Sequence, residues 1–535
     1  MSNTLRKAAK SAVLIMVLTI ISKIIGLFRE IIIAACYGAG MQTDAFFVAS
    51  NICLTLFSSI GASLSTTFIP MYSELITLRG EKEANSFASN VINILFVVSL
   101  VLMLFGYRFS PFIVKVVAPG FTGETRQLAV ELLRILFPMF VFIIISNVST
   151  GILQSRDSFI APALIGIPYS VIVIISSVLF SKKYGIYTLA WATFLATISQ
   201  VLIQLPALRK KYQYTLCFDL KDKNLRRLGA LVLPVLLGTA VQQLNTLVDR
   251  MIASGLVEGS ISAITYSNRL LGFVNGVFVV AVSTVMYPLF SRYAAKEDYT
   301  DLGKTFTQTL AMVMIILLPV TVGAILLREE VVGIVFQRGA FDQQATSLTA
   351  YALAFYALGL AAFGIRAVLN RVFYALKDTS TPMINGVIVV GINIALNLIF
   401  VRYLAVGGLA LATSVSGWAG TLFLLKKLTK KLPAFKLSSV RRENSKILFA
   451  SLIMGLVVWV VKKSLNVVSL YLSFLILVLI GALIYLLMLK LFKVEGYRFF
   501  VNETKKIINN RRHVRDNPGF DRAEAAATKE MIHKK

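Results

Sequence analysis

The chain has 535 residues, 57% hydrophobic and 15% charged, with a mean hydropathy of +0.77, which excludes a soluble protein and indicates a polytopic membrane protein. The formal net charge of +28 does not indicate nucleic-acid binding, because the basic residues form short clusters between apolar segments, and we expect anionic membrane lipids as their partners. Three cysteines and two histidines offer no metal-ligand cluster, and no hydrolase or ATPase motif occurs, so we expect a transporter that is not an enzyme.

Fourteen apolar segments are long enough to cross a bilayer as helices, for which about 20 residues suffice. The expected fold class is therefore an all-α polytopic membrane protein with fourteen transmembrane helices. Several segments exceed the required length, which predicts tilt, bending or extension beyond the bilayer. The segments are 11–36, 44–76, 87–108, 127–154, 159–181, 185–208, 228–256, 261–291, 305–327, 345–376, 382–402, 404–426, 446–462 and 468–492.

Charged residues interrupt the first two segments. On a helix, Lys23 and Glu30 lie along one stripe with Arg29 beside it, and Asp44 follows at the start of the second segment. Each such charge costs about 2.5–3.5 kcal/mol at the centre of a bilayer, so we expect these residues to face a water-filled cavity. A structural role between helices, or snorkelling to the membrane surface, is the alternative.

The seventh and eighth segments carry a second set of polar residues. Asn245 and Asp249 share one stripe with Gln242, and the next helix carries Asn268 and Arg269. A cavity rich in Arg and Lys suits a phosphate-bearing substrate, because guanidinium groups make bidentate hydrogen bonds to phosphate oxygens. A charge pair between the two sets could also gate the cavity.

The basic residues also predict the topology. Dense clusters follow the sixth and twelfth segments, as RKK at 209–211 and KKLTKK at 426–431. The positive-inside rule places these loops, and with them both chain termini, in the cytoplasm.

An internal duplication appears when the chain is compared with itself at an offset of about 220 residues. TLAWAT at 188–193 aligns with GLALAT at 408–413, and ILQSRDSFIAP at 152–162 aligns with VFYALKDTSTP at 372–382. Each repeat holds six helices, so the two repeats have the same orientation in the membrane. We name them the N-lobe (1–210) and the C-lobe (229–432), and we expect a cavity between them.

The remaining segments lie outside the duplication. We expect a basic cytoplasmic loop at 211–228, two extra helices within 433–492, and a cytoplasmic interfacial segment with a disordered tail at 493–535.

Several motifs along the chain resemble one known family, the MurJ (MviN-like) lipid II flippases of the multidrug/oligosaccharidyl-lipid/polysaccharide exporter superfamily. The resemblance implies fourteen helices in two lobes that rock around a central site. It implies movement of undecaprenyl-pyrophosphate-linked disaccharide-pentapeptide (lipid II) from the inner to the outer leaflet of the bacterial cytoplasmic membrane for peptidoglycan synthesis, with the two extra helices forming a groove for the polyprenyl tail. The motifs are GLFRE and YGAGMQTDAFFVA within 26–49, APGF at 118–121, YSNRL at 266–270, FQRGAFD at 336–342 and RVFYALKDTSTP at 371–382.

The resemblance also implies roles for single residues. The essential arginines of the family fall on Arg29 and Arg269, with Lys23 in place of a further arginine, and these three would bind the substrate. The essential aspartate falls on Asp44, which with Glu30 and Asn268 would belong to the gate and cavity. An arginine pair and a glutamate of some members are missing from the FSSIG sequence at 57–61.

A sodium site of some members maps to Asp249, Asn393, Asn397 and Thr413. The family position at Asn397 can be Asp, so this chain would hold sodium weakly. The coupling energy is left open between sodium and the membrane potential, and the cell-wall synthesis machinery is a further candidate partner.

Three alternatives remain open at this stage. The substrate could be another undecaprenyl-linked oligosaccharide, such as a capsule, O-unit or spore polysaccharide precursor. A cation-coupled multidrug exporter of the same superfamily is more distant, since such an exporter would be expected to use acidic residues. For the site itself, Glu30 or Asp44 could pair with Arg29 as a structural ion pair.

The topology can be tested at Cys217, which lies in the basic loop. A membrane-impermeant thiol reagent added to intact cells should leave Cys217 unlabelled, because the loop is expected on the cytoplasmic side. Permeabilised cells are the control and should show labelling. Labelling of Cys217 in intact cells would reverse the predicted orientation.

Overall fold

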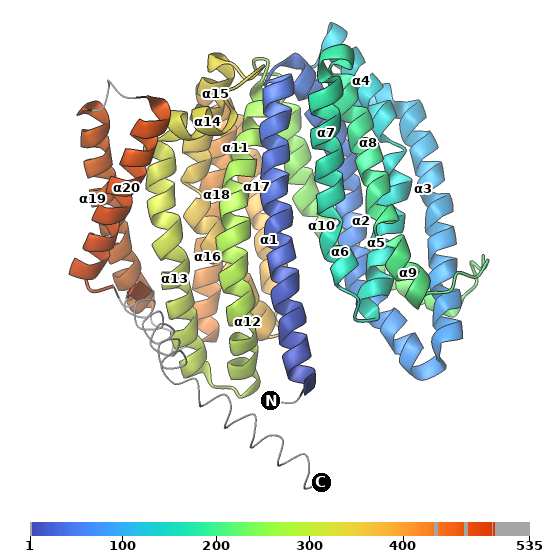
Figure 1. Ribbon diagram of the computed structural model, residues 1–535. Coiled ribbons are helices and arrows are strands. Elements are labelled where there is room, and N and C mark those ends of the chain that lie inside the picture. Colours follow the sequence, from blue (N-terminus) through green and yellow to red (C-terminus); the bar gives the residue numbers. More distant parts are fainter. Residues whose placement is uncertain (1–2, 433–436, 465–468, 495, 498–535) are drawn as a thin grey trace, which may run out of the picture. The chain divides into compact units, whose positions relative to one another are not determined.

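The computed structural model describes the backbone of residues 3–432, 437–464, 469–494 and 496–497. All regular structure in these residues is helical (Figure 1). The elements are α1 (Asn3–Tyr37), α2 (Met41–Arg79), α3 (Glu81–Val117), α4 (Gly123–Leu136), α5 (Met139–Ser155), α6 (Ile160–Leu164), α7 (Gly166–Tyr184), α8 (Ile186–Leu202), α9 (Leu205–Lys211), α10 (Lys223–Ala253), α11 (Ser260–Val274), the π-helical turn η1 (Asn275–Val279), α12 (Val280–Ala295), α13 (Tyr299–Leu326), α14 (Arg328–Phe336), α15 (Gln343–Ala357), α16 (Leu360–Ala375), α17 (Ser380–Leu404), α18 (Val406–Lys431), α19 (Leu437–Ser464) and α20 (Leu470–Leu491).

Within the described residues, nine helical segments are long and apolar enough to cross a membrane, or eleven if each of two bent helix pairs is one span. The bent pairs are α4 with α5, at 42°, and α15 with α16, at 46°. The prediction of an all-helical, multi-pass membrane protein is therefore confirmed. Three more long helices, α1, α2 and α10, have 35, 39 and 31 residues and carry most of the charges singled out above.

Structural details recur at the offset of the internal duplication. The two bent pairs stand at corresponding positions of the two predicted lobes. Asp157 and Lys377, at the ends of the second helix of each pair, both have left-handed backbones with φ of 55° and 58°. Gly185 and Ala405, which precede α8 and α18, have φ of 56° and 47°. Because non-glycine residues rarely adopt positive φ, matched pairs of this kind indicate matched backbone paths.

The connection between the predicted lobes runs along α3. The hydroxyl groups of Ser89 and Tyr212 lie 2.6 Å apart, and the side chain of Asn90 makes two hydrogen bonds of 2.8 Å with the backbone of Asp219. Burial raises the pKa of the Tyr212 hydroxyl to about 12, so it stays protonated. α10 begins at Lys223, within the range expected for the loop, and Asp222 caps it by accepting from the Asn224 backbone N–H at 2.8 Å.

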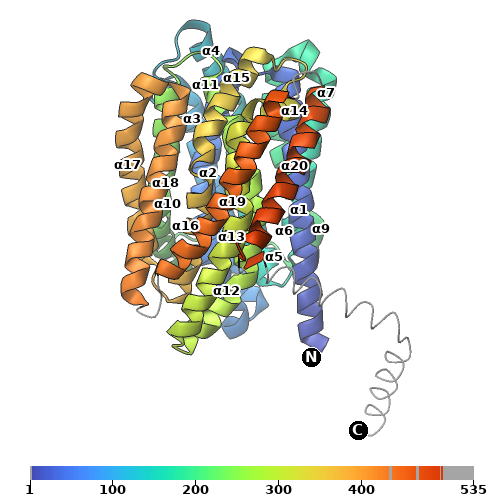
Figure 2. The same cartoon turned by 90° about the vertical axis from the view of Figure 1, so that its left-hand side faces the viewer.

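The described residues form two compact units. The first comprises residues up to Ala281 together with Gly323–Leu428, and it contains every candidate site residue named above. The second comprises Val282–Val322 with the described residues from Thr429 onward. In this second unit α19 and α20 lie side by side (Figures 1 and 2), and the Tyr485 hydroxyl of α20 donates to the Ile315 carbonyl of α13 at 2.7 Å. Almost all of the predicted interfacial segment and tail lies outside the described residues.

Candidate functional site

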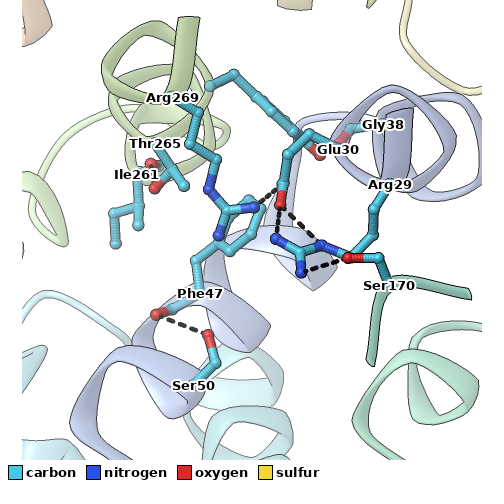
Figure 3. A network of polar contacts seen from close by, with 10 residues as sticks. Arg29, Glu30, Gly38, Phe47, Ser50, Ser170, Ile261, Thr265 and Arg269 are labelled. Carbon is cyan, nitrogen blue, oxygen red and sulfur yellow. Dashed lines mark hydrogen bonds and ion pairs between the residues drawn. The ribbon is translucent and has the colours of Figure 1, made fainter. Parts of the chain in front are cut away.

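One buried carboxylate joins two arginines from opposite predicted lobes. Glu30 on α1 is only 3% exposed. Its Oε1 accepts hydrogen bonds from Arg29 Nε at 3.1 Å and Arg29 Nη2 at 2.6 Å, and its Oε2 pairs with Arg269 Nη1 of α11. Figure 3 shows the two guanidinium groups converging on the carboxylate. The ion pair of Arg29 with Glu30, which the sequence left open as an alternative, is therefore present, and Glu30 pairs with Arg269 as well.

Aromatic rings and a hydroxyl group hold the two guanidinium groups in place. Arg29 lies over the Tyr169 ring of α7, with its carbon Cζ 5.1 Å from the ring centre, and its Nη1 is 3.4 Å from the Ser170 hydroxyl oxygen. Arg269 lies over the Phe47 ring of α2 at 5.3 Å. The two side chains remain 23% and 33% exposed, respectively, so an anion can reach them. Two arginines and one glutamate leave a net positive charge at this place.

The other predicted cavity residues lie apart from this group. Lys23 is six residues before Arg29, or about 9 Å along the axis of α1. A Cβ atom added to Gly276 of η1 would lie 2.5 Å from Lys23 Nζ, so the ammonium group reaches the opposite lobe at a π-helical turn, a feature common at functional sites. Asn268 is exposed and directly precedes Arg269 in α11.

Asp44 makes a different contact between the predicted lobes. It lies in the first turn of α2 and is 4% exposed. Its Oδ2 accepts from the Gly259 backbone N–H at 2.8 Å, and its Oδ1 accepts from the Ser262 backbone N–H at 2.7 Å and hydroxyl at 2.6 Å. These donors belong to the start of α11, where unpaired N–H groups and the helix dipole favour an anion. Asp44 thus caps a helix of the opposite lobe.

Backbones of the two predicted lobes touch at the same end, drawn at the top of Figure 1. A Cβ atom at Gly259 would lie 2.6 Å from the Ala39 carbonyl oxygen, and one at Gly339 would lie 2.3 Å from the Ala35 carbonyl oxygen. The Ala340 N–H donates to that Ala35 carbonyl at 2.8 Å. Both glycines have positive φ, so their small size and their backbone freedom are both needed. These contacts join the two predicted lobes at the end where Asp44, a residue expected in a gate, meets α11.

The four residues of the expected sodium site lie together on α10, α17 and α18. Asn397 Nδ2 donates to Asp249 Oδ1 at 2.6 Å. With the Asn393 amide turned to the orientation that satisfies both of its ends, its Nδ2 donates to Asn245 Oδ1 at 2.8 Å and its Oδ1 accepts from the Thr413 hydroxyl at 3.2 Å. Asn397 Oδ1 is buried without a hydrogen-bond partner among the described residues. As oriented, Asn397 offers hydrogens where a cation needs oxygens, so the group fits sodium only after the Asn397 amide rotates.

Some contacts of this site were not predicted from the sequence. Gly259 and Ser262 hold Asp44 from a distant part of the chain, and no motif pairs them. Ser170 and Tyr169 lie on the predicted segment 159–181, which has no charged residue, so the sequence did not single them out. The side chains at 57–59, where some family members carry charges, lie outside the described set.

A family model described as lipid II flippase MurJ matches residues 33–480. The chain belongs to this family. Curated relatives agree over most of the length. A probable lipid II flippase MurJ of Buchnera aphidicola subsp. Baizongia pistaciae is 30% identical over 465 residues, which cover 85% of this chain and 90% of that protein. The lipid II flippase MurJ of Burkholderia cenocepacia is 28% identical over 424 residues, 77% of this chain and 82% of that protein.

Solved structures show the same relationship. A structure titled "Lipid II flippase MurJ, inward closed conformation" has a TM-score of 0.79 at 31% identity and covers 91% of this chain and all of that one. An inward-facing multidrug resistance MATE family transporter of the MOP superfamily has a TM-score of 0.67 at 15% identity, covering 77% of this chain and 95% of that one. The second match concerns the fold alone, and the first confirms the fold of this family.

The gate can be tested with two glycine substitutions. Gly259→Ala should weaken the closed gate, because the added methyl group meets the Ala39 carbonyl. Gly185→Ala is the matched control, since Gly185 also has positive φ, has nothing within 4 Å of an added Cβ, and corresponds to Ala405 in the second half. Each change should cost about 1–2 kcal/mol of folding stability through backbone strain.

The measurement is the distance between spin labels on the exposed residues Glu124 and Gln344, one in each predicted lobe near the gate. Only Gly259→Ala should lengthen this distance. Equal distances in the two variants would mean that the Gly259 contact does not hold the gate.

Proposed function

We propose that this protein is a lipid II flippase, which moves undecaprenyl-pyrophosphate-linked disaccharide-pentapeptide from the inner to the outer leaflet of the bacterial cytoplasmic membrane for peptidoglycan synthesis. The observation that carries the proposal is the pair Arg29 and Arg269, held by Glu30 between the two predicted lobes. The curated relatives, named lipid II flippases, supply the substrate class.

The chemistry of this group suits a pyrophosphate. Each guanidinium group can give two parallel, charge-assisted hydrogen bonds to one phosphate. Glu30 would take the place of that anion before the substrate binds, since one of its oxygens accepts from Arg29 and the other forms an ion pair with Arg269. The substrate would replace Glu30 between the guanidinium groups, and Glu30 would neutralise them again after release. Lys23 would contact the sugar headgroup.

The contact of Asp44 with α11 would determine the direction of this exchange. With the basic clusters in the cytoplasm, the contact of Asp44 with α11 lies at the outer end of the protein. Substrate would enter from the inner leaflet while Asp44 holds that end shut. Rocking of the lobes would then break the Asp44 contacts and open the outer side. Asn268, exposed near Arg269, belongs to the same cavity in this scheme.

The proposal also includes fourteen membrane spans, an internal duplication and a groove formed by the two extra helices. α1, α2 and α10 would raise the eleven apolar spans to fourteen. The bends and turns that recur at corresponding positions of the two lobes support a duplication of six helices. α19 and α20 have no counterpart in it. Their exposed leucines, such as Leu456 at 62% and Leu483 at 68%, suit a groove for the polyprenyl tail.

A second candidate substrate is another undecaprenyl-linked oligosaccharide. Such carriers share the pyrophosphate that Arg29 and Arg269 would bind, so these residues do not distinguish the headgroups. A cation exporter is disfavoured, because the group around Glu30 has a net positive charge. The cell-wall synthesis machinery, which uses the translocated precursor, is a candidate partner of the flippase.

We also propose a weak sodium site at Asp249, Asn393, Asn397 and Thr413, which with the membrane potential is a candidate source of coupling energy. Rotation of the Asn397 amide would turn its unpartnered Oδ1 inward and complete a set of four oxygen ligands. The rotation gives up the hydrogen bond from Asn397 to Asp249, which is why the affinity should be low.

Conservative arginine substitutions test the substrate site. Arg29→Lys and Arg269→Lys should accumulate and fold normally but flip lipid II at least about tenfold more slowly in reconstituted vesicles, because lysine loses the bidentate contact. Arg29→Ala should lose flipping entirely. Arg134→Lys is the control, since Arg134 lies over Tyr107 within the N-lobe.

Two results would favour a purely structural ion pair over this proposal. One is wild-type flipping and growth with both lysine variants. The other is failure of either variant to accumulate in the membrane.

Restoring a carboxylate tests the sodium site. Asn397→Asp should lower thermal stability without sodium, because a second charge stands beside Asp249, and should gain more stability from added sodium than the parent does. Thermal unfolding in sodium chloride is the measurement, and the same concentration of potassium chloride is the control. If sodium changes neither protein, these residues do not form a sodium site.

A further inference from the structure

Arg250 is a buried charge to which the proposed function assigns no role. It follows Asp249 on α10, is 7% exposed and faces α2 and α11. A guanidinium group buried in a membrane protein must bind oxygens or approach negative charge, because an unpaired charge there is costly. The oxygens that Arg250 binds indicate its function.

Arg250 holds two helices of the gate together. Its Nη1 donates to the Ile261 carbonyl at 3.0 Å, in the first turn of α11. With the Asn51 amide turned so that Oδ1 faces the guanidinium group, the orientation that satisfies both partners, Asn51 accepts from Nη2 at 3.0 Å and from Nε at 3.1 Å. Asn51 lies on α2, two helical turns after Asp44. The guanidinium group therefore binds the opposite lobe through Asn51 and, through Ile261, the turn of α11 that Asp44 caps.

Arg250 also lies close to two carboxylates. Asp249, which is half-buried, precedes it on α10, and Asp44, which is buried, accepts from Ser262, the neighbour of the Ile261 whose carbonyl Arg250 binds. Asp249 in turn accepts from Asn397. The guanidinium group is thus near one carboxylate of the gate and one carboxylate of the polar group on α10, α17 and α18.

We infer that Arg250 is a positioning residue that keeps the gate closed and transmits the charge of Asp249 to it. When the lobes separate, Arg250 loses Asn51 and Asp44, and Asp249 becomes its remaining counter-charge. Neutralising Asp249 therefore disfavours the open state more than the closed state. This inference rests on the gate of the proposed function and does not depend on the identity of the substrate.

The experiment measures the lobe distance with spin labels at Glu124→Cys and Gln344→Cys, after replacement of Cys36, Cys53 and Cys217 by serine. Arg250→Gln and Asn51→Ala should each raise the ratio of long to short distances, by about fivefold for each hydrogen bond lost. The double variant should show no more than the larger single effect, since both changes remove the same contact.

Three further variants separate positioning from simple stabilisation. Arg250→Lys keeps the positive charge but loses the planar guanidinium group. Its ratio of long to short distances should lie between those of the parent and Arg250→Gln. Asp249→Asn should shift the distances toward the closed state, and should lose this effect when combined with Arg250→Gln. Arg134→Gln removes an arginine that acts within one lobe and should leave the distances unchanged.

Distinct results would overturn the inference. Lower thermal stability of Arg250→Gln with unchanged distances would make Arg250 a structural residue only. Additive effects of Asn51→Ala and Arg250→Gln would show that they do not act together. If Asp249→Asn shifts the distances toward the closed state also in the absence of Arg250, or shifts them toward the open state, then Arg250 does not transmit the charge of Asp249 to the gate. Loss of flipping is not among the readouts, so failure here leaves the substrate proposal standing.

Discussion

A carboxylate buried within a membrane protein must have its charge balanced by donors, and in this chain both key carboxylates find those donors on the opposite predicted lobe. Glu30 pairs with Arg269, and Asp44 accepts from the start of α11. The cost of an unpaired buried charge is several kcal/mol, far more than a typical hydrogen bond contributes. The same requirement that keeps these residues paired therefore binds the lobes to each other, and any opening must supply replacement partners.

The two kinds of pairing differ in what can replace them. The guanidinium groups around Glu30 are partly exposed, so in the proposed function a pyrophosphate would exchange with the carboxylate. Asp44 is almost fully buried against backbone N–H groups, which cannot follow it when the lobes part. Substrate chemistry and gate chemistry are thus separated along α1 and α2, while α11 serves both.

The polar group on α10, α17 and α18 meets the same requirement internally. Asn397 donates to Asp249 and so replaces part of what a cation would supply. Because the Asn397 amide presents a nitrogen where a carboxylate would present an oxygen, this position donates a hydrogen bond and does not offer a ligand to a cation.

The sequence alone determined the all-helical membrane fold, the motifs of the family, and the charges that had to be paired. These features depend on local composition, on apolar length and on the regular offset between repeated motifs, all of which can be read along the chain. Only the tertiary structure decided the partners. From the sequence, Glu30 could equally have paired with Arg29 alone. No motif near Asp44 indicates that Gly259 and Ser262 are its hydrogen-bond donors. Pairing between residues so far apart in the chain depends on how helices pack, and packing is set by the sum of many weak apolar contacts that no single motif records.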